Sequence, residues 1–158
     1  MKNEHLHFLQ LAVEEAKKGV LSNDGGPFGA AIVRRGELIA LAHNEVLKTN
    51  DPTAHAEVVA IRRASAILGR FDLSDCVLYA TCEPCPMCLA ASYWAKIKTL
   101  VYACSRHDAA RAGFDDAFIY EVLEGKAEDK RMEVLQMGRE MALSAFELWQ
   151  QKGDKTLY

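Results

Sequence analysis

Residues 77–95 read VLYATCEPCPMCLAASYWA, and this stretch decides the fold. Its first five residues are mostly apolar, as in a buried strand. Two prolines follow and mark a helix start, because proline is favoured in the first helical turn. Three cysteines cross this junction at intervals of three residues: Cys82, Cys85 and Cys88. We therefore expect a strand, a helix from Pro84 or Pro86 to about Ala95, and a metal or redox site between them.

Strands and helices alternate on both sides of this junction. The expected helices cover residues 4–18, 50–68, 84–95 and 139–151, and the expected strands cover 28–33, 37–42, 77–81, 99–103 and 132–137. The first two strands form a hairpin across the turn Arg34-Arg35-Gly36. An opening hairpin followed by alternating helices and strands predicts a sheet covered on both faces. The fold class is α/β: a three-layer αβα sandwich with a mixed five-stranded sheet.

Length and composition predict one ordered domain over residues 1–158, with residues 152–158 as a polar C-terminal tail. Half of the 158 residues are hydrophobic, which is enough for a core without disulfides. Five cysteines, three of them clustered, are typical of a metal or redox site in a reducing compartment, so we expect a cytoplasmic protein. No stretch suits a signal peptide or a membrane span. The net charge of −3 disfavours nucleic acid as a partner.

Three kinds of site compete for the cysteine run. An iron–sulfur cluster usually needs a fourth cysteine nearby, but the next one is Cys104. A dithiol needs only two sulfurs and leaves the third unexplained. A catalytic zinc site takes three protein ligands and keeps a fourth position open to water. A structural zinc site would need a fourth ligand, for which Cys82 is the nearby candidate.

The zinc interpretation also needs a ligand from outside the cysteine run, and His55 supplies it. Residues 53–57 read TAHAE, so His55 and Glu57 lie two residues apart, just after the expected helix start at Pro52. A lone histidine or a buried cysteine is usually structural. Combined, His55-x-Glu57 and Pro84-Cys85-x-x-Cys88 match the signature of zinc nucleobase deaminases. We therefore predict His55, Cys85 and Cys88 as ligands of one zinc ion, with Glu57 free to carry protons.

At these residues the chain resembles the cytidine deaminase-like superfamily, and most closely its small zinc-dependent guanine deaminases. The resemblance rests on GGPFGA at 25–30, NDPTAHAE at 50–57, CEPCPMC at 82–88, AGFDD at 112–116 and the terminal Tyr158. It covers nearly the whole chain. The His55-Ala56-Glu57 and Cys85–Cys88 motifs indicate the superfamily, whereas AGFDD and the aromatic C-terminus indicate the guanine-type enzymes.

The resemblance implies hydrolytic removal of the amino group of guanine, giving xanthine and ammonia. Glu57 would then be the general acid–base, in preference to Glu83, which we expect to cap or brace the second helix start. It implies that Asp116 contacts the base and assists the departing amine, whereas the role of Asp115 stays open. The remaining substrate-binding candidates are Phe28, Asn44, the backbone of Ala56, Trp94 and Tyr158.

The resemblance also implies a homodimer in which the C-terminal tail is swapped, so that Tyr158 covers the active site of a neighbouring subunit. Three alternative activities stay open. Deamination of guanosine, or of cytosine or cytidine, fits the same motifs. Deamination of adenosine in transfer RNA is disfavoured by the acidic net charge and by MGREMALSAFELW at 137–149, which carries one arginine.

Overall fold

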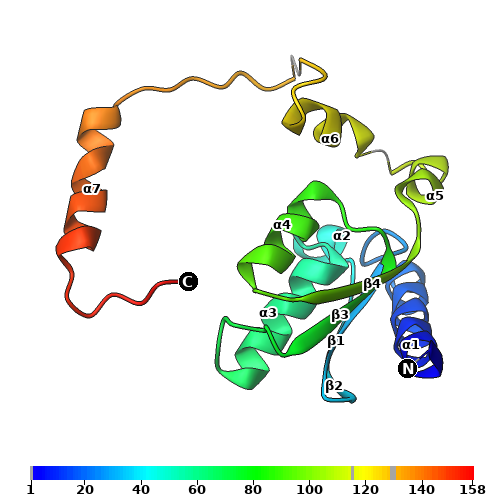
Figure 1. Cartoon of the computed structure of the whole chain (residues 1–158). Helices are drawn as coiled ribbons and strands as arrows, with labels where there is room; N and C mark the ends of the chain where they lie inside the picture. Colours follow the sequence, from blue (N-terminus) through cyan, green and yellow to red (C-terminus); the bar gives the residue numbers. More distant parts are fainter. Residues whose placement is uncertain (1, 115, 129–130) are drawn as a thin grey trace.

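The structure is a computed structural model, and it describes residues 2–114, 116–128 and 131–158. Its centre is one sheet with the strand order β2-β1-β3-β4 (Figure 1). The strands are β1 (Gly29–Arg34), β2 (Glu37–His43), β3 (Cys76–Cys82) and β4 (Thr99–Cys104). β1 pairs antiparallel with β2 and β3, and β3 pairs parallel with β4. The sheet is therefore mixed, as predicted.

The hairpin between β1 and β2 forms at the predicted turn. Arg35 and Gly36 both have positive φ, 52° and 79°, which is the backbone of a type I′ turn. This turn type matches the twist of paired strands, so it joins two antiparallel strands tightly. Glycine adopts such a φ without strain, whereas Arg35 adopts it at a small cost.

Helices cover the two faces of the sheet. α1 (Lys2–Leu21) lies on one face, and α3 (Ala56–Leu68) lies on the other, with α4 (Pro86–Trp94) packed beside it (Figure 1). Alternate residues of β1 serve the two faces, because successive strand side chains point in opposite directions. Ala30 and Ile32 belong to the larger core cluster, which α3 covers. Ala31 and Val33 pack with Phe8 of α1 in the smaller cluster.

The helix α1 packs very closely on the sheet at one glycine. A Cβ atom at Gly29 would lie 2.0 Å from the backbone oxygen of Ala12. Only glycine fits here, because any side chain would push the helix away from β1. This close approach fixes the start of β1, and therefore the segment before it, against α1.

The sheet has four strands in the part of the chain that the structure describes, so the predicted fifth strand over 132–137 is wrong. These residues run as an extended segment without a strand neighbour, and Val134 is 78% exposed. The sequence MEVLQM alternates like a strand, but a strand forms only where another strand accepts its hydrogen bonds. In this chain β4 is the edge of the sheet, and residues 132–137 do not pair with it.

The predicted helix over 50–68 begins later than expected. A short helix α2 (Val46–Thr49) comes first, Asn50 adopts a left-handed conformation, and α3 begins at Ala56. The side chain of Asp51 accepts hydrogen bonds from the backbone N–H and the hydroxyl of Thr53, at 2.8 and 2.6 Å. This local turn competes with the helix, which is the usual behaviour of aspartate outside helices.

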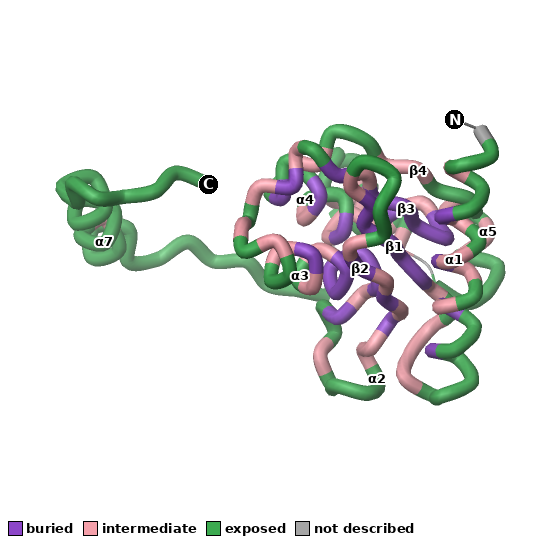
Figure 2. The backbone as a smooth tube through the Cα atoms, turned by 90° about the horizontal axis from the view of Figure 1, so that it is seen from below, coloured by how far each residue is buried: buried purple, intermediate pink, exposed green. Residues whose placement is uncertain are grey.

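The last third of the chain carries three helices and no buried residue among those described. They are α5 (Arg106–Arg111), α6 (Ala117–Leu123) and α7 (Arg139–Gln151). α7 has the predicted bounds. Figures 1 and 2 show that residues 131–151 extend away from the sheet, and that α7 is exposed along its length. Among the described helices, none is both long and apolar enough to cross a membrane.

Candidate metal centre and active site

Two helix starts meet at the end of β3. His55 is the N-cap residue of α3, and Cys85 is the N-cap residue of α4, with Pro86 in its first turn. Both cap residues have extended backbones and neither uses its side chain as a cap. Their side chains are therefore free to face each other across the gap. Each helix start also contributes unpaired N–H groups and a positive dipole end, which favour negative charge nearby.

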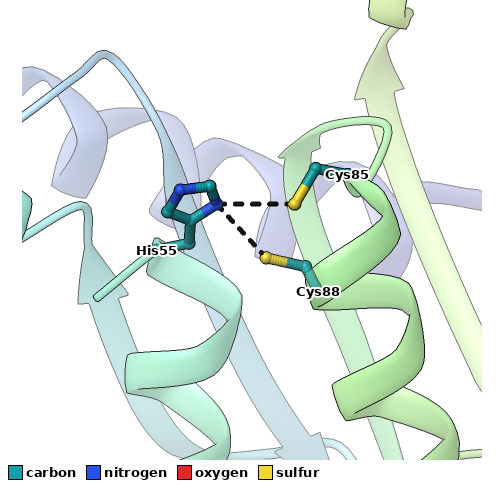
Figure 3. Close-up of side chains that lie close together, drawn as sticks. All are labelled: His55, Cys85 and Cys88. Atoms are coloured by element: carbon teal, nitrogen blue, oxygen red, sulfur yellow. Dashed lines mark hydrogen bonds between the residues drawn. The ribbon is translucent and has the colours of Figure 1, made fainter. Parts of the chain in front are cut away.

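Three potential metal ligands converge in this gap (Figure 3). The Sγ atoms of Cys85 and Cys88 each lie 3.5 Å from Nδ1 of His55. The three ligand atoms all lie within 4.8 Å of one another. Tetrahedral zinc, with Zn–S near 2.3 Å and Zn–N near 2.0 Å, places sulfur and nitrogen about 3.5 Å apart. The group therefore fits one zinc ion.

The charges of the three groups are coupled. The hydrogen bond from Cys88 is the largest influence on Cys85; burial opposes it, His55 adds to it, and together they lower the pKa of Cys85 to about 4. The same bond, together with burial, raises the pKa of Cys88. The hydrogen bond to Cys85 raises the pKa of His55. Zinc binds cysteine as the thiolate, so a bound cation would favour loss of the proton from both sulfurs.

Cys82 stands apart from this group. Its thiol points to the backbone oxygen of Ser105, with a sulfur–oxygen distance of 3.4 Å. Burial raises its pKa to about 11, so it stays a neutral thiol. The described His, Cys, Asp and Glu side chains provide only three members of the metal group, and Cys82 is not one of them. This arrangement is typical of a zinc site with an open position, whereas structural sites use four protein ligands.

Glu57 lies in the first turn of α3, two residues after His55. Its side chain lines the cavity next to the metal group, and the residue is only 8% exposed. Burial is the largest influence on Glu57 and raises its pKa. A carboxyl group with a raised pKa exchanges protons more readily near neutral pH than an ordinary glutamate. Ala56, its neighbour, is fully buried and is not among the residues that line the cavity.

The cavity has a volume of about 410 Å³, within the usual range of small-molecule sites. Three of the predicted substrate-binding residues line it: Phe28, Asn44 and Asp116. Phe28 packs edge to face against Phe114, with ring centroids 5.0 Å apart. Asp116 is the N-cap residue of α6, and Asp115 lies outside the described residues.

Asn44 is held rigidly at the wall of this cavity. It is buried, and its side-chain oxygen accepts a hydrogen bond from the backbone N–H of Val46 at 3.1 Å. A Cβ atom at Gly25 would lie 2.1 Å from that oxygen, so only glycine fits beside the amide. Loop 23–27 and Asn44 are therefore one packed unit.

The other two predicted substrate-binding side chains lie outside the cavity of their own chain. Trp94 is the last residue of α4 and is 66% exposed. Tyr158 packs against Trp94 and Phe71, with ring centroids 6.1 and 6.3 Å away. Neither residue lines the cavity that contains His55 and Glu57. The structure thus brings Phe28, Asn44, Glu57 and Asp116 together with the metal group, and leaves Trp94 and Tyr158 on the surface.

Sequence reasoning missed two residues beside this site. Arg106 lines the cavity and binds Glu83, and Tyr120 packs on Arg106. Glu83 was expected to cap or brace α4, but its carboxylate binds Arg106 at the start of α5. One signal was readable: Ser105 and Asp108 form a capping box, which marks a helix start at Arg106. No local pattern indicates Tyr120.

Comparison with known proteins agrees with this geometry. Residues 2–104 match the family described as the cytidine and deoxycytidylate deaminase zinc-binding region. The chain belongs to the cytidine and deoxycytidylate deaminase family. Its family membership and the His55, Cys85 and Cys88 group together assign one zinc ion to the chain.

Three similar proteins differ in how much of this chain they match. Guanine deaminase from Bacillus subtilis is 49% identical over 98% of this chain and 99% of its own length. Its solved structure superposes with a TM-score of 0.92, over 98% of both chains. A solved complex with 2,6-diaminopurine is 35% identical, covers 69% of this chain and 61% of that chain, and has a TM-score of 0.66. The tRNA-specific adenosine deaminase of Aquifex aeolicus is 42% identical over 61% of this chain and 64% of its own length.

Proposed function

We propose that the chain is a zinc-dependent guanine deaminase, which hydrolyses guanine to xanthine and ammonia. The observation that carries this proposal is the full-length similarity to the Bacillus subtilis guanine deaminase, which includes the last third of the chain. That third supplies cavity residues such as Phe114 and Asp116. The tRNA-specific adenosine deaminases match less of the chain, 61% for that of Aquifex aeolicus at 42% identity and 83% for that of Streptococcus pyogenes at 35% identity. The zinc group and the buried Glu57 are what a hydrolytic deaminase of any base needs.

Glu57 is the proton carrier in this proposal. His55, Cys85 and Cys88 would hold the zinc, which supplies Lewis-acid chemistry when bound. Glu57 takes a proton from the attacking water and gives it to the ring nitrogen next to the carbon that bears the amine. It then helps to protonate the leaving amine, so that the C–N bond breaks and ammonia departs. Burial of Glu57 and its place on the cavity wall support this role.

The cavity walls would hold the planar base. Phe28 and Phe114 offer aromatic surface, and the fixed side-chain amide of Asn44 offers hydrogen bonds to a base edge. Asp116 lines the same cavity and would contact the base and assist proton transfer to the departing amine. The backbone N–H groups near Ala56 and Cys85 belong to helix starts and would stabilise negative charge at the reacting carbon.

A substrate panel tests this proposal directly. Zinc-loaded protein is incubated with guanine, guanosine, cytosine, cytidine and a transfer-RNA anticodon stem–loop, and ammonia release is measured. We expect guanine to have the highest kcat/KM, and the Glu57→Gln variant to lose that activity while it keeps its zinc. A higher kcat/KM for guanosine or cytidine than for guanine would show that the substrate is that nucleoside and not the free base. Deamination of the stem–loop, weakened by salt, would overturn the small-molecule assignment.

We also propose a homodimer in which the C-terminal segment crosses to a second copy of the chain and Tyr158 covers the active site there. Three observations support it. α7 exposes large apolar side chains, including Met141, Phe146 and Leu148, which need a partner surface. β4 is an unpaired sheet edge within the described strands. Tyr158 does not line the cavity of its own chain.

Mixing two chains of low activity tests whether Tyr158 acts in a second copy. One chain carries Glu57→Gln, and the other lacks residues 153–158. After unfolding and refolding together, mixed dimers have one site with both an intact Glu57 and a tail from the neighbour. Random pairing then restores activity at about a quarter of the sites. No recovery, combined with a monomeric mass by light scattering, would contradict the swap.

The cellular site of this activity is a further part of the proposal. All five cysteines of the described structure are free thiols. A chain with several thiols and no disulfide suits a reducing compartment, which supports action in the cytoplasm.

A further inference from the structure

Two side chains beside the cavity connect segments that are far apart in the sequence. Arg106, the first residue of α5, binds Glu83 through three hydrogen bonds. Nη2 and Nε donate to Oε1 at 2.7 and 3.1 Å, and the backbone N–H donates to Oε2 at 3.0 Å. Glu83 in turn donates its backbone N–H to the oxygen of Cys104, at 2.8 Å. The start of α5 is thereby joined to the loop that precedes Cys85.

Tyr120 extends this connection to α6. The guanidinium carbon of Arg106 lies 3.9 Å from the centroid of the Tyr120 ring, a cation–π contact. The hydroxyl of Tyr120 donates to the backbone oxygen of Pro84 at 2.7 Å. Pro84 directly precedes the metal ligand Cys85. Tyr120 therefore links α6 directly to Pro84 and, through Arg106, to Glu83.

The same helix begins at Asp116. Asp116 is the N-cap residue of α6, and Tyr120 lies four residues later, about one helical turn away. Asp116 lines the cavity together with Glu83, Cys85 and Arg106. α6 has seven residues, and none of them is buried, so the helix is not packed into the core. Side-chain contacts therefore help to set the position of Asp116 relative to the metal group, and Tyr120 makes two of them, with Arg106 and with Pro84.

We propose that Arg106 and Tyr120 are positioning residues that hold Asp116 at the reacting centre. This inference rests on the proposed function, in which Asp116 contacts the base and assists the leaving amine. The Arg106–Tyr120 clamp, defined as these two side chains with Glu83 and Pro84, holds α6 against the metal-ligand loop. Loosening the clamp displaces Asp116 and lowers kcat, because a small displacement of a reacting group costs a large factor in rate.

The first test measures the clamp itself, without any assay of activity. Hydrogen exchange at the amides of α6 is compared by mass spectrometry between the full-length zinc protein and its Tyr120→Leu variant. We expect faster exchange over 117–123 in the variant, with exchange in α3 unchanged. Tyr93→Leu is the matched control, because Tyr93 is 74% exposed on α4. Unchanged exchange in α6 would overturn the clamp, whatever reaction the protein catalyses.

The second test asks whether the clamp acts through Asp116. In the otherwise native chain, Tyr120→Leu lowers kcat for guanine by about 10- to 100-fold, with little change in KM. In a chain that already carries Asp116→Asn, the same substitution costs less than about twofold, since the group to be positioned is gone. Equal losses in both backgrounds would show a merely structural role and overturn the proposal.

Milder variants keep the test decisive if Tyr120→Leu unfolds. Tyr120→Phe removes the bond to Pro84 and keeps the ring on Arg106. Arg106→Lys keeps the positive charge but loses the planar contact and one of the bonds to Glu83. Both are expected to lower kcat less than Tyr120→Leu, and again only when Asp116 is present. Failure of the wild type to deaminate guanine, with the exchange result intact, would refute the proposed function and leave the clamp standing.

Discussion

The first two thirds of the chain and the last third differ in how they are held together. Every buried residue of the described structure lies between Phe8 and Ala95 (Figure 2). Residues 105–158 contribute three helices and no buried side chain among those described. Yet the cavity takes residues from both parts: His55 and Glu57 from the first, Phe114 and Asp116 from the second.

This difference coincides with a difference in how far the comparisons extend along the chain. The family match ends at residue 104 and contains the metal group, whereas the similarity to the Bacillus subtilis guanine deaminase covers 98% of the chain. The packed part contains the metal group and the buried Glu57. The exposed part is held by few contacts, so changes in it are expected to alter activity without unfolding the protein. Four predictions test this contrast, from the largest expected effect to the smallest.

The largest effect is expected from Glu57→Gln in the packed part. Removing a general acid–base group lowers kcat by about 10²- to 10⁴-fold. The amide keeps the size of the buried side chain, so zinc content and thermal unfolding stay close to wild type. Glu37→Gln, at the exposed start of β2, is the control and keeps full activity. Near-normal turnover in Glu57→Gln would show that another group carries the proton.

The next effect is expected from deleting residues 153–158 at the far end of the exposed part. Loss of a lid over the active site lowers kcat/KM by about 10- to 100-fold, because water and the base are no longer enclosed. The melting temperature changes little, since none of these residues is buried. Steady-state kinetics and calorimetry measure the two quantities. A fully active truncated monomer would contradict the proposed role of Tyr158.

A smaller effect is expected where the two parts touch at Phe114. Phe114→Ala removes the edge-to-face contact with Phe28, which is worth about 0.5–1.5 kcal/mol. We expect KM for guanine to rise about two- to tenfold, with kcat nearly unchanged. Tyr93→Ala, on the exposed side of α4, serves as the control. A fall in kcat with constant KM would show that Phe114 acts on the chemical step instead.

The smallest effect concerns stability in the packed part and its dependence on pH. Hydrogen bonds from Arg34 and Arg70 lower the pKa of Asp75 from 3.8 to about 2. A lowered folded-state pKa stabilises the protein above the unfolded-state value, and this contribution is lost as pH falls from about 4 through about 2. Asp75→Asn is expected to lower the melting temperature by a few degrees at most at pH 7, because the pair is at the surface.

The difference in melting temperature between Asp75→Asn and wild type should disappear near pH 2. Activity stays unchanged, because Asp75 lies outside the cavity. A difference that persisted unchanged at pH 2 would show that the side chain acts through packing and not through charge.

The elements around the metal group were predictable from local patterns. Proline before a helical run indicates the start of α4, and a continuous apolar run indicates β1, whose residues lie in both core clusters. The three zinc ligands were predictable because zinc binds imidazole and thiolate groups, and the sequence places one histidine and two cysteines at two expected helix starts. The start of α3 was missed by several residues, because Asp51 forms a turn with Thr53 that competes with the helix.

The remaining features depend on partners that are distant in the sequence. Residues 132–137 alternate like a strand but find no strand to pair with, and strand formation requires such a partner. Tyr120 binds a carbonyl 36 residues earlier, at Pro84, which no periodicity indicates. Tyr158 was expected over an active site, and its position against Trp94 follows from the course of the whole C-terminal segment.

Full burial of Cys88 has a consequence for metal exchange. Of the three ligands, only His55 and Cys85 border the cavity, and Cys88 has no exposed surface. A chelator must therefore enter by the same opening as the substrate. An inhibitor bound in that opening would block the chelator and slow the loss of zinc. The inhibited protein would therefore keep its zinc longer than the free protein when a chelator is present.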